Sequence, residues 1–213
     1  MHAAAGLRQD GMDLLSLIEN PAATIDRIAG HLDTLPPAER LAESRALGRS
    51  AQRKLWNKAK AAPALSLADF VPQALPARAP VRHHGRNTLP VPGPFRLFEK
   101  RFCRPDAGGE RLFGYNEGIT RSWIGPGFFV THPTKGNPEW EERGAIVIDY
   151  FEVPDSPVAD GWPEVVPNNW RLQRLVYFHT RDFMRRVSKH VTIGAAHKEE
   201  KPLDHYFVLV REE

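Results

Sequence analysis

Residues 114–132 read GYNEGITRSWIGPGFFVTH, and the glycines of this stretch decide how the rest of the chain is interpreted. A phosphate-binding loop leads from its glycines into a helix whose N-terminal amides face the anion. Here the glycines lead into FFVTH, which is typical of a strand, and no Lys-Ser/Thr pair follows them. Pro126 followed by Gly127 is the pattern of a type II turn, because proline fixes φ and glycine accepts a positive φ. We therefore predict a hairpin here and not a nucleotide site.

The alternation of apolar and polar residues continues from Phe95 to the end of the chain. It predicts strands at residues 95–104, 110–116, 119–124, 128–132, 144–152, 171–179, 189–197 and 204–211, and one inserted helix at 180–187. Short connections between successive strands require antiparallel pairing. The expected class is α+β, with N-terminal helices followed by a curled eight-strand antiparallel β-sheet or barrel. A closed barrel removes exposed edges and can hold one small ligand, whereas a strongly curved sheet wrapped around a helix is the alternative.

The sequence divides into three segments with different patterns: two precede the predicted sheet, and the third forms it. Residues 1–62 are helical in pattern, and an amphipathic helix is expected at about 36–60, where Leu47, Ala51 and Leu55 recur every four residues. Residues 63–94 are rich in proline, which disfavours both helices and central strands, so they are expected to form a wrap or a linker. Residues 95–213 form the expected antiparallel β domain.

Composition places the chain among ordinary globular proteins. It has 213 residues, of which 41% are hydrophobic and 26% charged. No run approaches the roughly 20 apolar residues of a membrane helix, so no membrane partner is expected. Its N-terminus lacks the pattern of a secretory signal, and we expect a cytoplasmic protein, from a bacterium to judge by its Ala, Arg and Pro usage. Cys103 is the single cysteine, which excludes an intramolecular disulfide or a thiolate zinc site.

Basic residues are concentrated in one segment. Residues 40–60 hold seven basic side chains against one acidic side chain, Glu43, so this segment carries +6 in a chain whose net charge is +3. Arg45, Arg49 and Arg53 recur every four residues and would lie on one helix face. They could meet an acidic partner. Nucleic acid is not favoured, because no aromatic residues interleave with the arginines.

Several polar residues fall in register with apolar residues on predicted strands. If those faces all point inward, one lumen would hold Asn116, His132, Asp149, Arg174 and His197. We assign His132, Asp149 and His197 as candidate catalytic residues, because a His–Asp pair can move a proton near neutral pH. Asn116 and Arg174 are candidate ligand-binding residues. Alternatively, these groups form structural salt bridges, reach solvent at strand ends, or belong to a different register.

The loop at residues 154–170 is long for a strand connection and contains Trp162 and Trp170. Long loops of this kind often act as lids or binding loops. Together with Trp123, these residues are expected to line the mouth of a ligand pocket. No metal site is expected, because His83 and His84 are adjacent in a proline-rich segment and form a poor chelate. The cofactor is left unknown.

These patterns lead to three hypotheses of function. The favoured one is a small-molecule-binding β-barrel-like protein for an anionic or amphipathic ligand, with residues 154–170 as its lid. The second is an acid–base enzyme, an isomerase, lyase or cyclase, that uses a His/Asp/Arg lumen. The third is an interaction module whose basic helix binds an acidic protein or nucleic acid.

Overall fold

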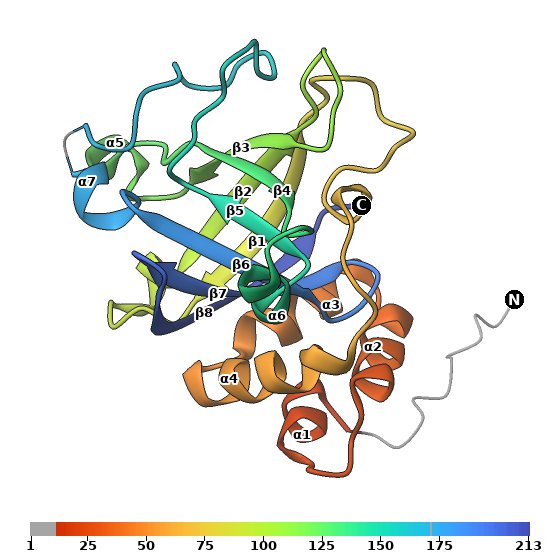
Figure 1. Cartoon of the computed structure of the whole chain (residues 1–213). Helices are drawn as coiled ribbons and strands as arrows, with labels where there is room; N and C mark the ends of the chain where they lie inside the picture. The colour runs from red at the N-terminus through yellow and green to blue at the C-terminus, as the bar shows by residue number, and fades with distance from the viewer. Residues whose placement is uncertain (1–11, 171) are drawn as a thin grey trace, which may run out of the picture.

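Eight antiparallel strands close into a barrel in the computed structural model, which describes residues 12–170 and 172–213 (Figure 1). Each strand pairs with the next, and β8 returns to pair with β1. The expected α+β class, with N-terminal helices ahead of an antiparallel barrel, is confirmed. Among the described residues, no helix has the length and apolar character needed to cross a membrane. The N-terminal residues on which the expected absence of a secretory signal depends lie outside the described part.

The strands are β1 Val81–Asn87, β2 Leu97–Cys103, β3 Leu112–Glu117, β4 Phe129–Pro133, β5 Ile146–Asp149, β6 Thr180–Arg186, β7 Val191–Lys198 and β8 Lys201–Arg211. The α-helices are α1 Leu14–Glu19, α2 Ile25–Thr34, α3 Pro37–Ala46, α4 Arg49–Lys58, α5 Arg121–Ile124, α6 Pro138–Arg143 and α7 Gln173–Val176. The described residues also form three short 3-10 helices, η1 Ala59–Ala61, η2 Leu67–Asp69 and η3 Gly93–Arg96.

The strand that closes the barrel lies in the proline-rich segment, where no strand was expected. β1 fits there because no proline falls within residues 81–87; Pro80 and Pro90 lie outside both ends of the strand. It pairs with β2 on one side and β8 on the other, so it occupies a central position in the sheet. The high proline content of residues 63–94 as a whole did not indicate a strand, although residues 81–87 themselves contain no proline.

Three other predicted elements differ from the structure. The inserted helix predicted at residues 180–187 is strand β6, which is held between β5 and β7 by pairing along its length. The strands predicted at 119–124 and 171–179 contain the short helices α5 and α7 instead, and Arg171 lies outside the described residues. Both helices belong to connections at one end of the barrel, where no neighbouring strand is available to pair with them. Gly127 has the positive φ that the turn prediction requires, at +54°, but residues 125–128 have no turn assignment, and the chain enters β4 at Phe129.

The N-terminal helices cover one side of the barrel wall (Figure 1). Their buried residues, including Ile28, Leu32 and Leu55, join the outward-facing residues Val147 and Phe183 in one apolar cluster. The long helix expected at 36–60 is two helices, because the chain is extended at residues 47–48 between α3 and α4. This break turns α4 against β7 and β8.

One end of the barrel is closed by residues 65–71. Phe70 and Val71 are fully buried with interior residues such as Phe102. The Nε2 of His83 donates a hydrogen bond to the Phe70 carbonyl at 2.9 Å, and Arg186 binds the Asp69 carboxylate with two bonds of 2.6 Å. Residues 65–71 therefore pack against interior residues at this end of the barrel. The division of the chain into a helical segment, a proline-rich wrap or linker and a β domain stays a prediction.

We expect His83 to make the barrel sensitive to acid. Burial lowers the pKa of His83 from 6.5 to about 3. As the pH falls through 6.5, His83 becomes protonated in the unfolded chain, whereas in the folded protein it stays neutral until about pH 3. The free energy of unfolding therefore falls across this window. Urea unfolding should lose about 2–3 kcal/mol between pH 7 and about pH 4.5 from this residue alone. In His83→Gln, which keeps a donor for Phe70 and does not titrate, this part of the loss should disappear; identical pH slopes would contradict the assignment.

Candidate ligand-binding site

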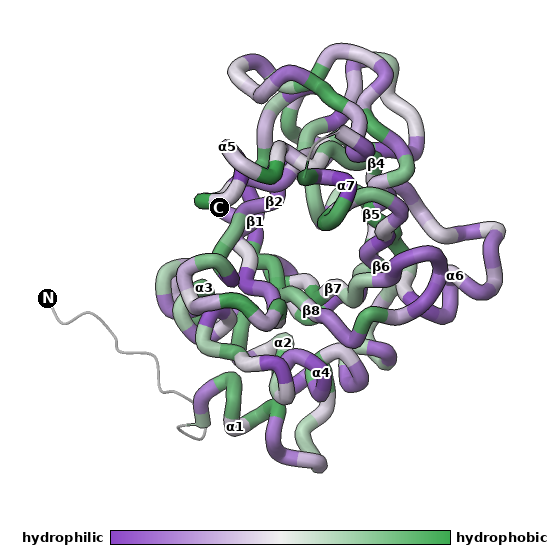
Figure 2. The backbone as a smooth tube through the Cα atoms, turned by 90° about the vertical axis from the view of Figure 1, so that its left-hand side faces the viewer, coloured by the Kyte–Doolittle hydropathy of each residue, from purple (hydrophilic) through white to green (hydrophobic). Residues whose placement is uncertain are grey.

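The open end of the barrel holds a cavity of about 430 Å³. Figure 2 looks onto this end of the barrel, where α5 and α7 lie. The lining is mostly apolar. It comprises Asn87, Leu89, Val91, Pro92, Phe95, Leu97, Phe98, Lys100, Asn116, Glu117, Gly118, Ile119, Thr120, Arg121, Ile124, Tyr150, Val176, Tyr177, Thr180, Asp182, Ala196, Leu203, His205, Tyr206 and Phe207. The size and the small number of polar groups are typical of small-molecule sites.

Three glycines on the inner face shape the barrel interior. Gly85, Gly114 and Gly194 stand directly opposite Phe98, Phe129 and Phe207 on the paired strands. A Cβ at any of them would come within 2.7 Å of the facing ring. Each glycine thus leaves the space in which its partner's ring lies against the sheet. Glycine–aromatic pairs of this kind also fix strand register.

The same three rings surround a buried ammonium group. The Nζ of Lys100 lies 5.7 Å from the ring centre of Phe98 and 5.0 Å from those of Phe129, Tyr150 and Phe207. Lys100 is 2% exposed, which is rare for lysine. Aromatic faces attract a cation, most strongly where water is excluded. The glycines of the inner face therefore determine where a charge can be held.

Lys100 also has three polar partners at the inner end of the cavity. Its ammonium donates to Asn116 Oδ1 at 2.9 Å, to Asp182 Oδ2 at 3.2 Å, and to the Tyr150 hydroxyl. The Asn116 amide in turn donates to the Gly127 carbonyl at 2.9 Å. All three ammonium protons are thus used, which is what a buried charge requires. Tyr177 stacks on Tyr150 at 5.3 Å, and its hydroxyl has no hydrogen-bond partner among the described residues.

Burial controls the protonation of these groups. It lowers the pKa of Lys100, and the Asp182 carboxylate opposes that shift. It raises the pKa of Tyr150 well above its usual value and also raises that of Tyr177, so both hydroxyls stay protonated at neutral pH. The cavity has no net charge, because Lys100 is paired with Asp182 and, at the rim, Arg121 is paired with Glu117 at 2.7 Å.

The structure brings one of the five sequence-predicted lumen residues, Asn116, into this cavity. Strand register puts His132, Asp149 and His197 on the outer face, alternate to inward residues such as Thr131 and Ile148. These three residues do alternate with apolar residues, as the sequence pattern indicated. The apolar face that they share is the outer face of the barrel wall, which packs against the N-terminal helices and α6. Their catalytic role stays a prediction. Should they act, they act outside the barrel.

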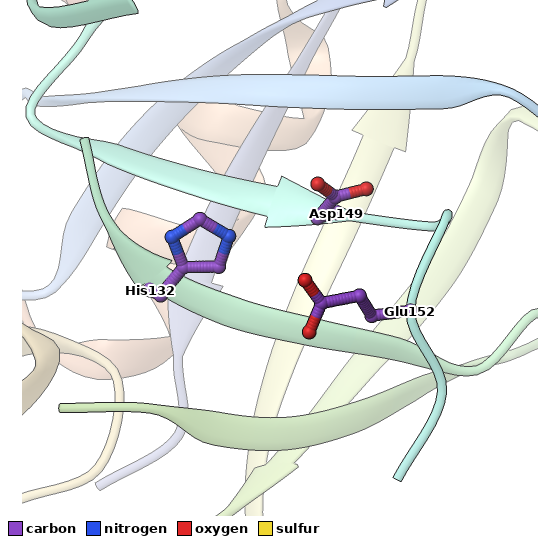
Figure 3. A group of neighbouring side chains, drawn as sticks. All are labelled: His132, Asp149 and Glu152. Carbon is purple, nitrogen blue, oxygen red and sulfur yellow. The ribbon is translucent and has the colours of Figure 1, made fainter. Parts of the chain in front are cut away.

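His132, Asp149 and Glu152 lie together on that outer surface (Figure 3). One potential ligand atom from each lies within 4.8 Å of the others. The Nδ1 of His132 is 3.1 Å from the Pro133 carbonyl, and donation to it would leave Nε2 as an acceptor, the form that a metal needs. Among the described residues, this group is where a metal ion could be held.

The guanidinium group of Arg181 already binds the Asp149 carboxylate. Arg181 Nε donates to its Oδ2 at 2.7 Å, and the Phe151 backbone N–H donates to its Oδ1 at 2.8 Å. Arg181 is also stacked over Phe151 and Trp140 and bonded to Glu200. This network accounts for Asp149 without a metal ion, and the expected absence of a metal site stays a prediction. His197 is further away and lines a separate outer cavity of about 220 Å³.

The tryptophans do not line the cavity. Trp162 packs on the outer wall against Tyr115 at 4.9 Å, over Phe113 and Cys103. No residue of 154–170 lines the opening, so the loop expected to act as a lid covers the wall instead. Trp170 is half exposed in the turn before α7, whereas Trp123 on α5 stands beside the opening and is 73% exposed. Arg174 is exposed on α7 at the same end.

The basic stripe is divided between two helices. Arg45 belongs to α3, whereas Arg49 and Arg53 belong to α4. Arg49 already pairs with Asp204 of β8 at 2.6 Å. Binding of an acidic partner by these arginines stays a prediction.

Sequence reasoning missed Lys100, Tyr150 and Asp182. In β2, LFEKRFC places Lys100 in alternation with Phe98 and Phe102, which is the same signal that selected Asn116. Asp182 was missed because residues 180–187 were read as a helix. Comparison of the chain with known protein families, characterised proteins and solved structures finds no match in any of the three. The site is therefore interpreted from its geometry alone.

Breaking the buried pair should destabilise the barrel strongly. Lys100→Met leaves the Asp182 carboxylate buried without its counter-charge, which costs about 3–5 kcal/mol of unfolding free energy. The double variant Lys100→Met/Asp182→Leu removes both charges and should lose less than the sum of the single changes. Urea unfolding measures all of these values.

The exposed pair Arg111–Asp155, at 2.9 Å, is the control, and Arg111→Gln should have a much smaller effect. Equal losses at both pairs would show that the charge of Lys100 is not buried in solution.

Proposed function

We propose that this chain binds a small amphipathic molecule in the open end of its barrel, with the polar end of the molecule innermost. A closed eight-strand barrel is an architecture that can hold one small ligand. The observation that carries the proposal is the cavity of about 430 Å³, which is apolar at the mouth and ends at Lys100, Asn116, Tyr177 and Asp182. The apolar body of the ligand lies against residues such as Phe95 and Val176.

The charges of the cavity favour an uncharged polar end over an anionic one. Asp182 already neutralises Lys100, and all three ammonium protons have partners. A ligand carboxylate would add a buried charge without a counter-charge, and burying an unpaired charge is costly. The protonated hydroxyl of Tyr177 can donate and the Asp182 carboxylate can accept, so a hydroxyl, carbonyl or amide is the fitting polar end. This narrows the anionic-or-amphipathic ligand of the sequence hypothesis.

The acid–base enzyme of the second hypothesis gains less support. Its candidates His132 and Asp149 lie outside the barrel, and His197 lines a different cavity. Lys100 and Asp182 are ionisable, but they neutralise each other, and all three ammonium protons of Lys100 are donated within the protein. Binding is therefore the function that this geometry supports best.

A neutral fluorescent probe tests the proposal. N-phenyl-1-naphthylamine should become brighter on binding, and decanol should displace it at a concentration at least about tenfold lower than decanoate does at neutral pH, because the carboxylate brings an unpaired charge. In Asp182→Asn the ammonium of Lys100 loses its counter-charge, so the preference should shift toward decanoate. A probe that stays dark with the wild-type protein would refute the proposal, and equal displacement by the two compounds would refute the neutral polar end.

A second variant keeps the buried pair intact. Ala196 lines the cavity on β7, and Ala196→Phe fills part of it, so probe affinity should fall at least about tenfold with little change in unfolding. The matched control is Ala74→Phe at an exposed position outside the cavity lining, which should bind the probe like the wild type.

A further inference from the structure

Exposed apolar side chains are concentrated around the cavity opening. Of the twelve large hydrophobic residues that are exposed in the described part of the chain, eight lie at this end. We call them the apolar rim: Phe95, Leu97, Ile119, Trp123, Leu172, Leu175, Val176 and Leu203. Trp123 and Leu175 are each 73% exposed and Ile119 is 65% exposed. An exposed apolar patch of this kind marks an interaction site.

The rim is built from four separate connections that meet at one end of the barrel. They are the β1–β2 connection with η3, the β3–β4 connection with α5, the β5–β6 connection with α7, and the β7–β8 turn with the start of β8. The second and third are tied together, because the buried Gln173 side chain accepts a hydrogen bond from the Gly127 backbone N–H at 2.8 Å. In Figure 2 hydrophobic colour is seen at α7 and next to α5, at the same end of the barrel.

Charges at the rim are basic where they are unpaired. Arg96 and Arg174 make no ion pair with any described residue, and Arg121 is paired with Glu117. Residues 88–97, 118–128 and 172–178, which carry seven of the eight rim residues, contain no acidic side chain. In the β7–β8 turn, Glu200 is bonded to Arg143 and Arg181, and at the start of β8 Asp204 is bonded to Arg49. The surface around the apolar side chains therefore complements an anionic partner.

We infer that the apolar rim docks on the surface of an anionic lipid bilayer, with the cavity opening toward the lipid. Exposed aromatic and aliphatic side chains flanked by arginines are the composition of interfacial membrane contacts. The rim encircles the opening, so a second protein seated on it would shut the cavity. A bilayer instead lets an amphipathic molecule pass from lipid into the barrel without crossing water.

This orientation rests on the proposed function, whereas the contact itself rests on the rim. The sequence expectation of no membrane partner came from the lack of an apolar run long enough to span a bilayer. A shallow contact by loop side chains needs no such helix.

Vesicle flotation tests the inference. The wild-type protein should float with vesicles of phosphatidylcholine and phosphatidylglycerol, and less with phosphatidylcholine alone. Trp123→Ser/Leu175→Ser removes two rim side chains and should lower partitioning at least about tenfold, because burial of each contributes that much or more. The matched control, Leu15→Ser/Leu75→Ser, removes two exposed apolar residues away from the rim and should float like the wild type. Arg174→Gln should reduce only the preference for phosphatidylglycerol.

Three outcomes would overturn the inference. The wild-type protein could remain unbound with both kinds of vesicle, or the control could lose binding as much as the rim variant. The protein could also form a dimer by light scattering that Trp123→Ser/Leu175→Ser abolishes, in which case a second copy covers the rim. Flotation without any response to the naphthylamine probe would refute the ligand site and leave the membrane contact standing. A bright probe without flotation would refute the membrane contact and leave the ligand site standing.

Discussion

The buried ammonium of Lys100 is the interaction on which the rest of the barrel interior depends. A single positive charge inside an apolar barrel is unfavourable unless its solvation is replaced. Here Asp182, Asn116 and Tyr150 supply hydrogen bonds, and four aromatic rings supply attraction to their faces. The rings can approach because glycines stand opposite three of them. The charge of Lys100 thus depends on glycines, phenylalanines and a carboxylate that lie on different strands. Because Asp182 neutralises Lys100, the cavity beside them has no net charge.

The architecture could be predicted from the sequence, because alternation over a long segment with short connections requires an antiparallel sheet that curls. Individual elements could not be assigned equally well. Residues 180–187 have a plausible helix cap at Thr180, yet pairing on both sides makes them strand β6. Residues 119–124 and 171–179 have the alternation of strands, but several of their apolar side chains, such as Trp123 and Leu175, face solvent around the opening. Local pattern cannot distinguish an apolar residue that packs inward from one that serves a contact with another surface.

The candidate site was found only in part for a related reason. A barrel wall buried on both sides gives apolar residues on both faces, so alternation does not say which face is the lumen. Asn116 belongs to the inward set, whereas His132 and Asp149 belong to the outward set beneath α6. Lys100 carries the same signal as Asn116, although lysine is seldom buried. Strand register, which the sequence does not contain, separates the two sets.

The pairing of β1 with β8 has a consequence for how the chain matures. Gly85 and Leu209 are neighbours across the seam, so more than half of the polypeptide must emerge before the first strand finds its last partner. Until then both seam strands present unpaired backbone groups, the kind of edge that invites association with other chains. Closing so long a loop is slow compared with forming hairpins. The N-terminal helices are synthesised before the strands. They are therefore available to cover the outer face of the barrel wall before β1 and β8 pair.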